Sequence, residues 1–323
     1  MKKIAVFTSG GDAPGMNACV RAVVRAALYN GLEVVGIRRG YKGMADADFI
    51  PMESHSVSDI IGLGGTILKS ARFDEFRDIE WRKKAYENCV KEGIDGLVAI
   101  GGNGTFTGAK LLMENFGIPT IGCPGTIDND LYGTDYTIGF DTAVNTALDA
   151  IDKIRDTAAS HDRVFFVEVM GRDAGFIAMQ SGIGGGAEDI LVPEIPDTID
   201  EVIDNLKKGG YKEKPSHIIV VAEGEEIGNA NFIAQKAKEA LPNLDIRVSN
   251  LGHIQRGGSP SAIDRILASR MGIAAVEGLI AGKSNVMAGI IDDKVAYTSF
   301  DDAINKKKPL DVELNKMVEI LNS

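Results

Sequence analysis

The sequence has few cysteines, and their spacing suits no metal or disulfide chemistry. Its 323 residues include only Cys19, Cys89 and Cys123, and no two of them form a CxxC pair. An odd number without such spacing argues against a disulfide framework and a zinc site. All three lie in apolar stretches, which predicts buried, reduced thiols and a cytoplasmic protein.

Long apolar segments and basic stretches are also missing. No uncharged apolar run approaches the roughly 18 residues that span a bilayer, and the N-terminal Met1–Ile4 lacks the apolar core of a signal peptide. The 35 basic and 46 acidic residues give a net charge of −11 at pH 7, which repels phosphate backbones and anionic membranes. We therefore expect neither nucleic acid nor a membrane as a partner.

Glycine is the residue that the sequence has in excess. It accounts for 38 of the 323 residues, well above the ~7% usual in proteins. The glycines do not form a low-complexity tract but cluster in short loops that follow apolar runs. We expect this placement to carry much of the information about function.

Short apolar, β-branched runs alternate with longer helical patterns along the chain. The runs are continuous rather than alternating, as expected of parallel strands covered on both faces. Repeated strand–loop–helix units predict an α/β fold with mainly parallel sheets, and the length predicts about two domains. We expect strands at Ile4–Phe7, Val34–Ile37, Leu97–Ile100, Pro119–Ile121, Val164–Val169, Ile190–Val192, His217–Ala222, Val248–Leu251 and Val286–Ile291.

Three segments have strong helical stripes. The first is Met16–Asn30, which is followed by Gly31, a residue suited to the position after a helix end. In the second, Asp141 is placed to cap the helix N-terminus. The third is Ser261–Ala281.

Two glycine-rich loops lie between a predicted strand and a predicted helix. They are Thr8–Gly15 (TSGGDAPG) and Gly101–Gly108 (GGNGTFTG). Glycine lets backbone N–H groups approach an anion, and a helix N-terminus adds partial positive charge. The first loop has neither the GxGxxG nor the P-loop pattern, and one such loop is as often a tight turn. Two of them favour a nucleotide with several phosphates, with Arg72 as a candidate phosphate ligand.

A pair of carboxylates follows another predicted strand. The segment Pro124–Asp130 (PGTIDND) places Asp128 and Asp130 two residues apart, and in a loop or an extended chain this spacing would point them the same way. In such a pair, one carboxylate can take a proton while the other helps to hold a cation. The alternative is an Asx-rich turn; the position after a buried strand favours the functional interpretation.

Arginines recur on glycine-rich loops in the second half. Arg172 lies in MGRDAG and Arg256 in GHIQRGG, each after a predicted strand. A guanidinium there can bind phosphate through two N–H groups. For His253, in the second loop, a buried structural histidine is the alternative. Together these loops predict phosphoryl transfer between a nucleotide and a phosphorylated small molecule.

The sequence resembles the bacterial ATP-dependent 6-phosphofructokinases over essentially its whole length. The resemblance rests on TSGGDAPGMN, SARF, PGTIDND, GTDYTIGF, MGR and GHIQRGGSP, which occur in this order. It implies the phosphofructokinase fold, with two Rossmann-like α/β lobes of mainly parallel sheets between helices. One lobe, residues 1–138 plus 252–304, would bind ATP, and the other, 139–251 plus 305–323, fructose 6-phosphate.

The family transfers the γ-phosphate of MgATP to the C1 hydroxyl of fructose 6-phosphate, and the resemblance assigns a role to each matching residue. Asp128 would be the general base, supported by Thr126, Asp130 and Gly11, and Arg172 would stabilise the transferred phosphoryl group. The implied ATP site comprises Gly11, Tyr41, Arg72, Phe73, Asn103, Gly104, Thr105 and Gly108. The implied sugar-phosphate site comprises Thr126, Asp128, Asp130, Met170, Gly171, Arg172, Glu223, His253 and Arg256.

The resemblance also implies partners and regulation. Arg163 and Arg247 match residues that reach across from a neighbouring subunit, so a homotetramer is implied. Bacterial members often bind ADP or phosphoenolpyruvate between subunits, and the residues that match this effector site are Arg21, Arg25, Arg155, Glu188, Lys212 and Lys214. Ser54 stands where effector-responsive members commonly have an arginine, and His55 follows it, which predicts weak or altered effector binding.

Three positions bear on the activity. The family pattern here is GGDG, and its aspartate helps to hold Mg²⁺; this chain has Asn103 at that position. Asp130 is a second candidate ligand. Magnesium prefers carboxylates. A raised magnesium requirement is expected, and a regulatory, non-catalytic paralogue is the alternative. Gly104 and Gly125 stand where pyrophosphate-dependent members have Asp and Lys, which favours ATP. An enzyme that acts on another phosphosugar is a second alternative. A Rossmann dehydrogenase is not favoured, because the first glycine loop of this chain lacks the GxGxxG motif.

Overall fold

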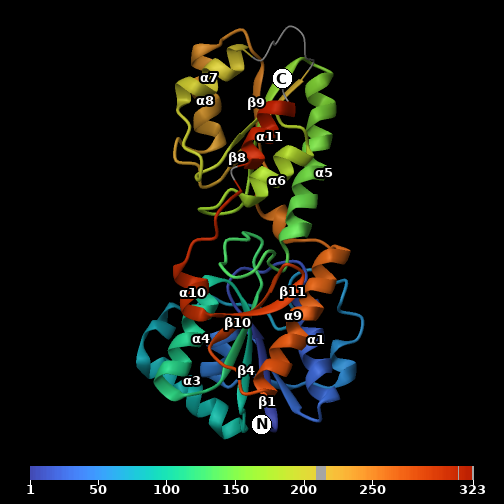
Figure 1. Ribbon diagram of the computed structural model, residues 1–323, viewed down its shortest axis with the longest axis vertical. Coiled ribbons are helices and arrows are strands. Elements are labelled where there is room, and N and C mark those ends of the chain that lie inside the picture. The colour runs from blue at the N-terminus through green and yellow to red at the C-terminus, as the bar shows by residue number, and fades with distance from the viewer. Residues whose placement is uncertain (209–215, 312, 322–323) are drawn as a thin grey trace. The chain divides into compact units, whose positions relative to one another are not determined.

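The computed structural model describes residues 1–208, 216–311 and 313–321 (Figure 1). The chain divides into two compact units. Unit 1 comprises Met1–Ile127, Leu131–Thr142 and Arg256–Lys308, and unit 2 comprises Asp128–Asp130, Ala143–Gln255 and Pro309–Ser323. The short segment Asp128–Asp130, expected in the first lobe from the sequence, thus clusters with unit 2.

Unit 1 is built on a seven-stranded sheet with the order β11-β10-β5-β4-β1-β2-β3. The five inner strands are parallel, as the sequence predicted: β1 (Lys3–Thr8), β2 (Glu33–Ile37), β4 (Gly96–Gly101), β5 (Thr120–Pro124) and β10 (Val286–Ile291). The two edge strands, β3 (Phe49–Pro51) and β11 (Lys294–Ser299), are antiparallel and were not predicted. Both are partly exposed, so they lack the continuous apolar pattern of a doubly covered strand.

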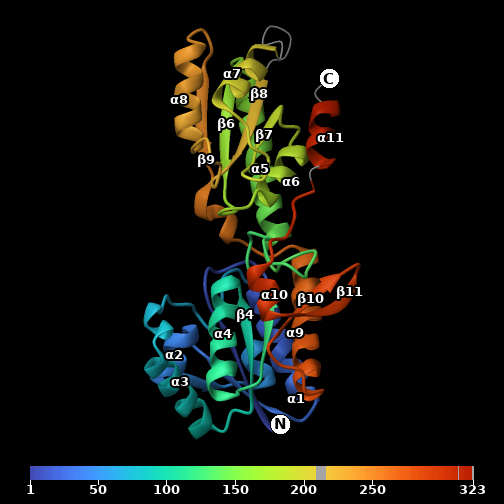
Figure 2. The ribbon, with the colours of Figure 1, turned by 60° about the vertical axis from the view of Figure 1, so that its left-hand side comes forward.

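Helices cover both faces of this sheet (Figures 1 and 2). One face carries α1 (Met16–Tyr29) and α9 (Ala262–Ile280), which pack on each other. The other carries α2 (Gly40–Asp46), α3 (Ile79–Glu92), α4 (Asn103–Phe116) and α10 (Phe300–Asn305). On that side Phe106 stacks on Phe300 with ring centroids 5.1 Å apart, both fully buried; each such side chain contributes roughly 2–3 kcal/mol through burial. All three cysteines are buried and free, as predicted.

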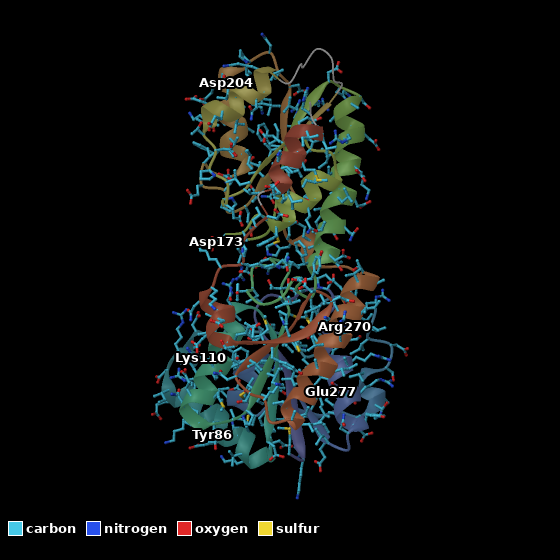
Figure 3. The ribbon with its side chains drawn as sticks, viewed as in Figure 1. Tyr86, Lys110, Asp173, Asp204, Arg270 and Glu277 are labelled. Atoms are coloured by element: carbon cyan, nitrogen blue, oxygen red, sulfur yellow. The ribbon has the colours of Figure 1, made fainter. Side chains whose placement is uncertain are left out.

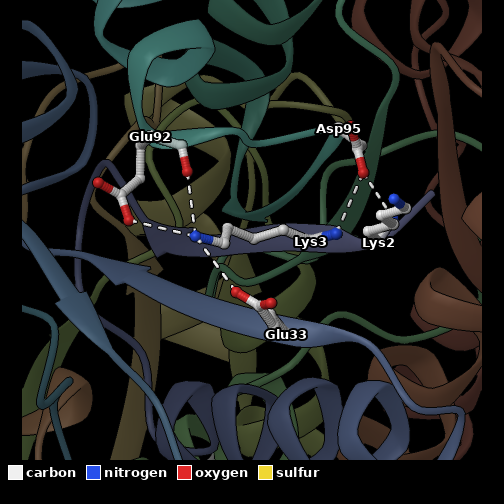
Figure 4. Close-up of polar contacts among 5 residues, drawn as sticks. All are labelled: Lys2, Lys3, Glu33, Glu92 and Asp95. Atoms are coloured by element: carbon white, nitrogen blue, oxygen red, sulfur yellow. Dashed lines mark hydrogen bonds and ion pairs between the residues drawn. The ribbon is translucent and has the colours of Figure 1, made fainter.

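Polar contacts fix the N-terminal end of β1 (Figure 4). The Lys3 ammonium lies 3.3 Å from Glu33 Oε2 on β2 and 3.5 Å from Glu92 Oε1 at the end of α3. The Asp95 carboxylate accepts the backbone N–H groups of Lys2 and Lys3, the latter at 3.1 Å, and these bonds lower the pKa of Asp95. These contacts lie at the end of β1 opposite its glycine loop.

Unit 2 contains a four-stranded parallel sheet with the order β7-β8-β6-β9. Its strands are β6 (Arg163–Val169), β7 (Asp189–Leu191), β8 (Ser216–Ala222) and β9 (Ile246–Asn250). One face carries α7 (Ile199–Lys208) and α8 (Ala230–Ala240), and the other α5 (Phe140–Ala159), α6 (Phe176–Gly184) and α11 (Glu313–Leu321) (Figure 1). No helix among the described residues has the length and apolar character needed to cross a bilayer.

Two of the three predicted helix ends are confirmed and one is wrong. Helix α1 is followed by Gly31 with φ of 73°, and Ser261 caps α9. Helix α5, however, begins at Phe140, so Asp141 lies in its first turn. The carboxylate that accepts the N–H groups of Gly139 and Thr142, both at 2.8 Å, belongs to Asp264 of α9. A residue more than 120 positions away supplies the acceptor.

Candidate active site

The two glycine loops of unit 1 meet at the carboxyl edge of its sheet. Strands β1 and β4 are neighbours, and their following helices, α1 and α4, cover opposite faces. Such a reversal is where open α/β sheets bind ligands. The Ser9 N–H donates to the Ile100 carbonyl at 3.0 Å, and the Thr105 hydroxyl donates to the Ser9 carbonyl at 3.1 Å. The loops predicted from separate motifs therefore form one surface.

The glycines in these loops serve different purposes. A Cβ at Gly104 would meet nothing within 4 Å, so this position is open, as an approaching phosphate requires. At Gly11 a Cβ would lie 3.2 Å from Nη1 of Arg256, so that guanidinium rests directly on the loop. At Gly108 a Cβ would lie 2.7 Å from the Tyr41 ring. The absence of a side chain at Gly108 therefore leaves space for the Tyr41 ring, not for a ligand.

Tyr41 supports the second loop from inside the core. Its ring stacks on Phe76 at 4.2 Å and meets Phe7 edge-on at 5.0 Å, and its hydroxyl donates to the Thr105 carbonyl. Burial raises the pKa of this hydroxyl. Phe73 packs against Trp81 at 5.4 Å, whereas Arg72 is exposed. Of the predicted nucleotide-site residues, Arg72 and Gly104 face solvent and Tyr41 does not.

Asn103 is the first residue of α4, preceded by Gly102 at the N-cap. The helix N-terminus favours an anion here, and the Asn103 side chain brings an amide oxygen without a negative charge. No group of three His, Cys, Asp or Glu side chains in the described part of the chain could hold a metal ion. Mg²⁺ at nucleotide phosphates takes one or two carboxylates from the protein, so the uncharged Asn103 oxygen is a weaker ligand than the aspartate that the resemblance predicts at this position.

The segment after β5 brings its first aspartate into a buried position. The Thr137 hydroxyl donates to the Thr126 carbonyl at 2.6 Å, and the Ile138 N–H donates to the Pro124 carbonyl at 2.8 Å. Asp128 is 3% exposed. Asn129 has φ of 55°, so the chain is not extended there, and the shared direction of Asp128 and Asp130 stays a prediction. A left-handed residue breaks the alternation of an extended chain.

Asp128 and Arg172 form an ion pair within unit 2. The Nε atom of Arg172 lies 3.3 Å from Oδ2 of Asp128, and 57% of the arginine side chain is exposed. Arg172 has φ of 53°. Its N–H donates to Oε1 of Glu223 at 2.8 Å, and a Cβ at Gly224 would lie 2.0 Å from its carbonyl oxygen. Glu223 and Gly224 thus hold the strained loop that presents the guanidinium.

The neighbouring loops of unit 2 converge on the same strand ends. The Met170 N–H donates to Oε1 of Gln255 at 3.3 Å, and Nε2 of Gln255 donates to the Gly252 carbonyl at 3.0 Å. Gln255 is fully buried, whereas His253 is exposed, so a buried structural histidine is not what this loop contains. Sequence reasoning missed Gln255, although it lies inside GHIQRGG, because a glutamine without a charge gave no signal.

Arg163 and Arg247 are brought together by a third residue that the sequence analysis also missed. Oδ2 of Asp245 lies 2.7 Å from Nε of Arg163, and Oδ1 lies 2.9 Å from Nε of Arg247. The hydrogen bond from Arg163 lowers the pKa of Asp245 most. Both arginines lie on adjacent parallel strands, β6 and β9, and only the register of these strands reveals the carboxylate between them.

The residues of the implied effector site are partly described. In unit 2, Nη2 of Arg155 donates to the carbonyls of Gly185 and Gly186, both at 2.6 Å, and Nη1 lies 3.7 Å from Glu188 Oε1. In unit 1, Arg21 and Arg25 lie one turn apart on α1. Lys212 and Lys214 lie outside the described residues.

Two α/β units, glycine loops at strand ends and a buried aspartate beside an arginine define an α/β phosphotransferase. Residues 3–279 match the family model described as phosphofructokinase, and the chain belongs to this family. It is 63% identical over 322 residues to an ATP-dependent 6-phosphofructokinase of Cytophaga hutchinsonii, covering 100% of this chain and 98% of the relative. A Thermus thermophilus enzyme described as ATP-dependent 6-phosphofructokinase 1 is 56% identical, covering 99% of each chain.

A solved structure agrees with the sequence comparison. The phosphofructokinase of Saccharomyces cerevisiae matches with a TM-score of 0.88 and 34% identity. The match covers 100% of this chain, which spans about half of the yeast chain (47%). The predicted phosphofructokinase fold, with mainly parallel sheets between helices, is confirmed.

Proposed function

We propose that this chain transfers the γ-phosphate of MgATP to the C1 hydroxyl of fructose 6-phosphate, giving fructose 1,6-bisphosphate and ADP. The observation that carries this proposal is the Asp128–Arg172 pair of unit 2, in a chain whose full-length relatives are described as ATP-dependent 6-phosphofructokinases. Phosphoryl transfer to a hydroxyl needs a base and a cation that lie next to each other.

Asp128 is suited to act as the base. A carboxylate that is 3% exposed has little competing solvent, and it would accept the hydroxyl proton as the oxygen attacks phosphorus. The Arg172 guanidinium would stabilise charge on the phosphoryl oxygens. Its backbone is fixed by Glu223, so the cation is oriented before the substrate arrives. Magnesium, carried by ATP, would neutralise the nucleotide's phosphates.

The donor is ATP rather than pyrophosphate because of two small residues. Gly104 is open, so an α-phosphate can pass, whereas an aspartate there would repel it. Gly125 is enclosed: a Cβ there would meet Ile100 at 3.0 Å and Met16 at 3.1 Å, which leaves no ready space for lysine. The relatives described as ATP-dependent favour the same donor.

The same proposal extends to assembly and regulation. Arg163 and Arg247, held by Asp245, would bind the sugar phosphate of a neighbouring subunit in a homotetramer. Arg155, Glu188, Arg21 and Arg25 would take ADP or phosphoenolpyruvate, with weakened affinity since Ser54 replaces a cation. The free thiols of all three cysteines support a cytoplasmic location.

A coupled assay with fructose 6-phosphate, ATP or pyrophosphate, and a magnesium series tests the function. We expect turnover with ATP alone, and a loss of at least about 100-fold in kcat for Asp128→Asn. Gly104→Asp should raise the KM for ATP, whereas Thr107→Asp, which adds the same charge at an exposed position of α4, should not. Turnover with pyrophosphate only, or no turnover at all, would contradict the proposal; the latter would support a regulatory paralogue.

A further inference from the structure

The loop that carries Arg172 has a backbone conformation that its surroundings must hold. Within residues 171–175 (GRDAG), which we call the Arg172 loop, Gly171 has φ of 147° and Arg172 has φ of 53°. Left-handed conformations of a residue such as arginine persist only where neighbouring groups fix them. The Arg172 side chain is 57% exposed, so the backbone largely determines where its guanidinium lies.

Two carboxylates that follow other strands of unit 2 anchor the two ends of the Arg172 loop. At its start, the N–H groups of Gly171 and Arg172 donate to Oε1 of Glu223, which follows β8, at 3.3 and 2.8 Å. At its end, the Gly175 N–H donates to both carboxylate oxygens of Glu194, at 2.9 and 3.0 Å. Glu194 lies just after β7. The loop after β6 is thus held from the ends of β7 and β8 together.

A tight turn places Glu194 against the Arg172 loop. The Ile195 N–H donates to the Val192 carbonyl at 3.1 Å, and Pro193 occupies the second position of this turn, where its fixed φ is favourable. A Cβ at Gly175 would lie 2.5 Å from Cβ of Val192 and 2.8 Å from Oε2 of Glu194, so the loop and the turn are in direct contact. Gly175 is also the N-cap of α6, and negative charge is favourable at a helix N-terminus. Local sequence and electrostatics therefore both keep Glu194 at this end of the loop.

We propose that Glu194 is a positioning residue of the phosphotransferase reaction. By fixing Gly175, it holds the Arg172 loop in the conformation that keeps the guanidinium beside Asp128. A misplacement of about 1 Å can lower the rate of a reaction by about 100-fold, so loss of this anchor affects the rate of transfer rather than the binding of ATP. This inference rests on the proposed function, in which Arg172 stabilises the transferred phosphoryl group.

Asp173 provides a matched control within the same loop. It follows Arg172 directly, and its side chain is exposed and extends into solvent (Figure 3). Asp173→Asn removes a negative charge next to Arg172 in the sequence but leaves the anchor at Gly175 in place. Glu194→Gln is a second control, because its amide oxygen can still accept the Gly175 N–H.

Steady-state kinetics of the full chain test the inference. We expect Glu194→Met to lower kcat by at least about tenfold, while the KM for ATP stays within about twofold. Glu194→Gln and Asp173→Asn should each keep kcat within about threefold of the unaltered chain. In an Arg172→Met chain, Glu194→Met should lower kcat by no more than about twofold, because a residue that acts through Arg172 then has nothing left to position. An equal loss in both backgrounds would overturn the inference.

Hydrogen exchange distinguishes a failure of this inference from a failure of the proposed function. In the substrate-free chain, the Gly175 amide should exchange at least about fivefold faster in Glu194→Met than in Glu194→Gln, because exchange requires the hydrogen bond to open. Mass spectrometry of peptides from this loop measures the rates, and unfolding midpoints verify that both variants are folded. Equal rates would overturn the inference even in an active enzyme. An absence of turnover by the unaltered chain, whatever the exchange rates, would instead overturn the proposed function and the catalytic role of Glu194 with it.

Discussion

Asn103 stands where the resemblance to the family predicts an aspartate. As the first residue of α4, it would meet the phosphates and their magnesium with an uncharged oxygen. We predict that Asn103→Asp lowers the magnesium concentration for half-maximal ATP-dependent activity by at least about threefold, because Mg²⁺ prefers carboxylates. Magnesium titrations at saturating ATP measure this. Thr107→Asp, one turn along the helix, is the control, and superimposable titrations of Asn103→Asp and the unaltered chain would refute the prediction.

Asp197 makes the stability of unit 2 depend on pH. Burial, and then the charges of Asp189, Glu225 and Glu201, raise its pKa from 3.8 to about 6. The folded chain thus keeps a proton that the unfolded chain releases near pH 4, so the free energy of unfolding falls as the pH rises from about 4 to 6. Two pKa units correspond to almost 3 kcal/mol, which partial exposure reduces to about 1 kcal/mol.

Asp197→Asn should therefore stabilise the chain at pH 7 by about 1 kcal/mol and have little effect near pH 4. Urea unfolding at several pH values between 4 and 7.5 measures the difference. Asp200→Asn, an exposed first-turn residue of α7, should bring no such gain. A constant difference between Asp197→Asn and the unaltered chain across this range would contradict the assignment.

Residues of the site differ in how far sequence could identify them. Motifs led to Asp128, Arg172 and Gly104, because charged or small residues stand in distinctive loops. Asp245 and Gln255 went unnoticed: the first acts through the register of two strands, and the second through a buried amide. The left-handed conformation of Asn129 was equally inaccessible, since neighbouring contacts select it.

The start of α5 depends on a contact between elements. Asp264 of α9 is fully buried and accepts hydrogen bonds from Gly139 N–H and from both donors of Thr142. We predict that Asp264→Asn lowers the free energy of unfolding by roughly 2–3 kcal/mol, because a buried amide group would then face N–H donors. Asp141→Asn, in the first turn of α5, should cost no more than about 0.5 kcal/mol.

Urea unfolding followed by Trp81, the only tryptophan, reports on unit 1 and tests this comparison. Equal costs for the two variants would show that Asp141 caps α5 after all.

At this scale sequence predicted most inner strands and helices, because burial on both faces leaves a continuous apolar pattern. It missed β3, β11 and the cap from Asp264, which depend on packing between distant segments.

The whole chain is acidic, yet both proposed substrates are anions. With a net charge of −11, long-range electrostatic repulsion opposes their approach. Affinity must therefore come from local groups: backbone N–H donors at helix N-termini and single guanidinium groups such as Arg256, which lies against Gly11. This explains why the glycine-rich loops stand at strand ends, where such donors are exposed.

Mixing two defective chains tests whether sites are shared between subunits. If Arg163 and Arg247 serve a neighbour's site, an Asp128→Asn chain and an Arg163→Ser/Arg247→Ser chain complement each other. Random 1:1 assembly after unfolding and refolding together then gives intact arginines and an intact base in one site of four, so roughly a quarter of the full activity should return. The assay is run at a fructose 6-phosphate concentration where neither parent turns over. Activity no higher than the mean of the parents would place the arginines and Asp128 in the site of a single chain.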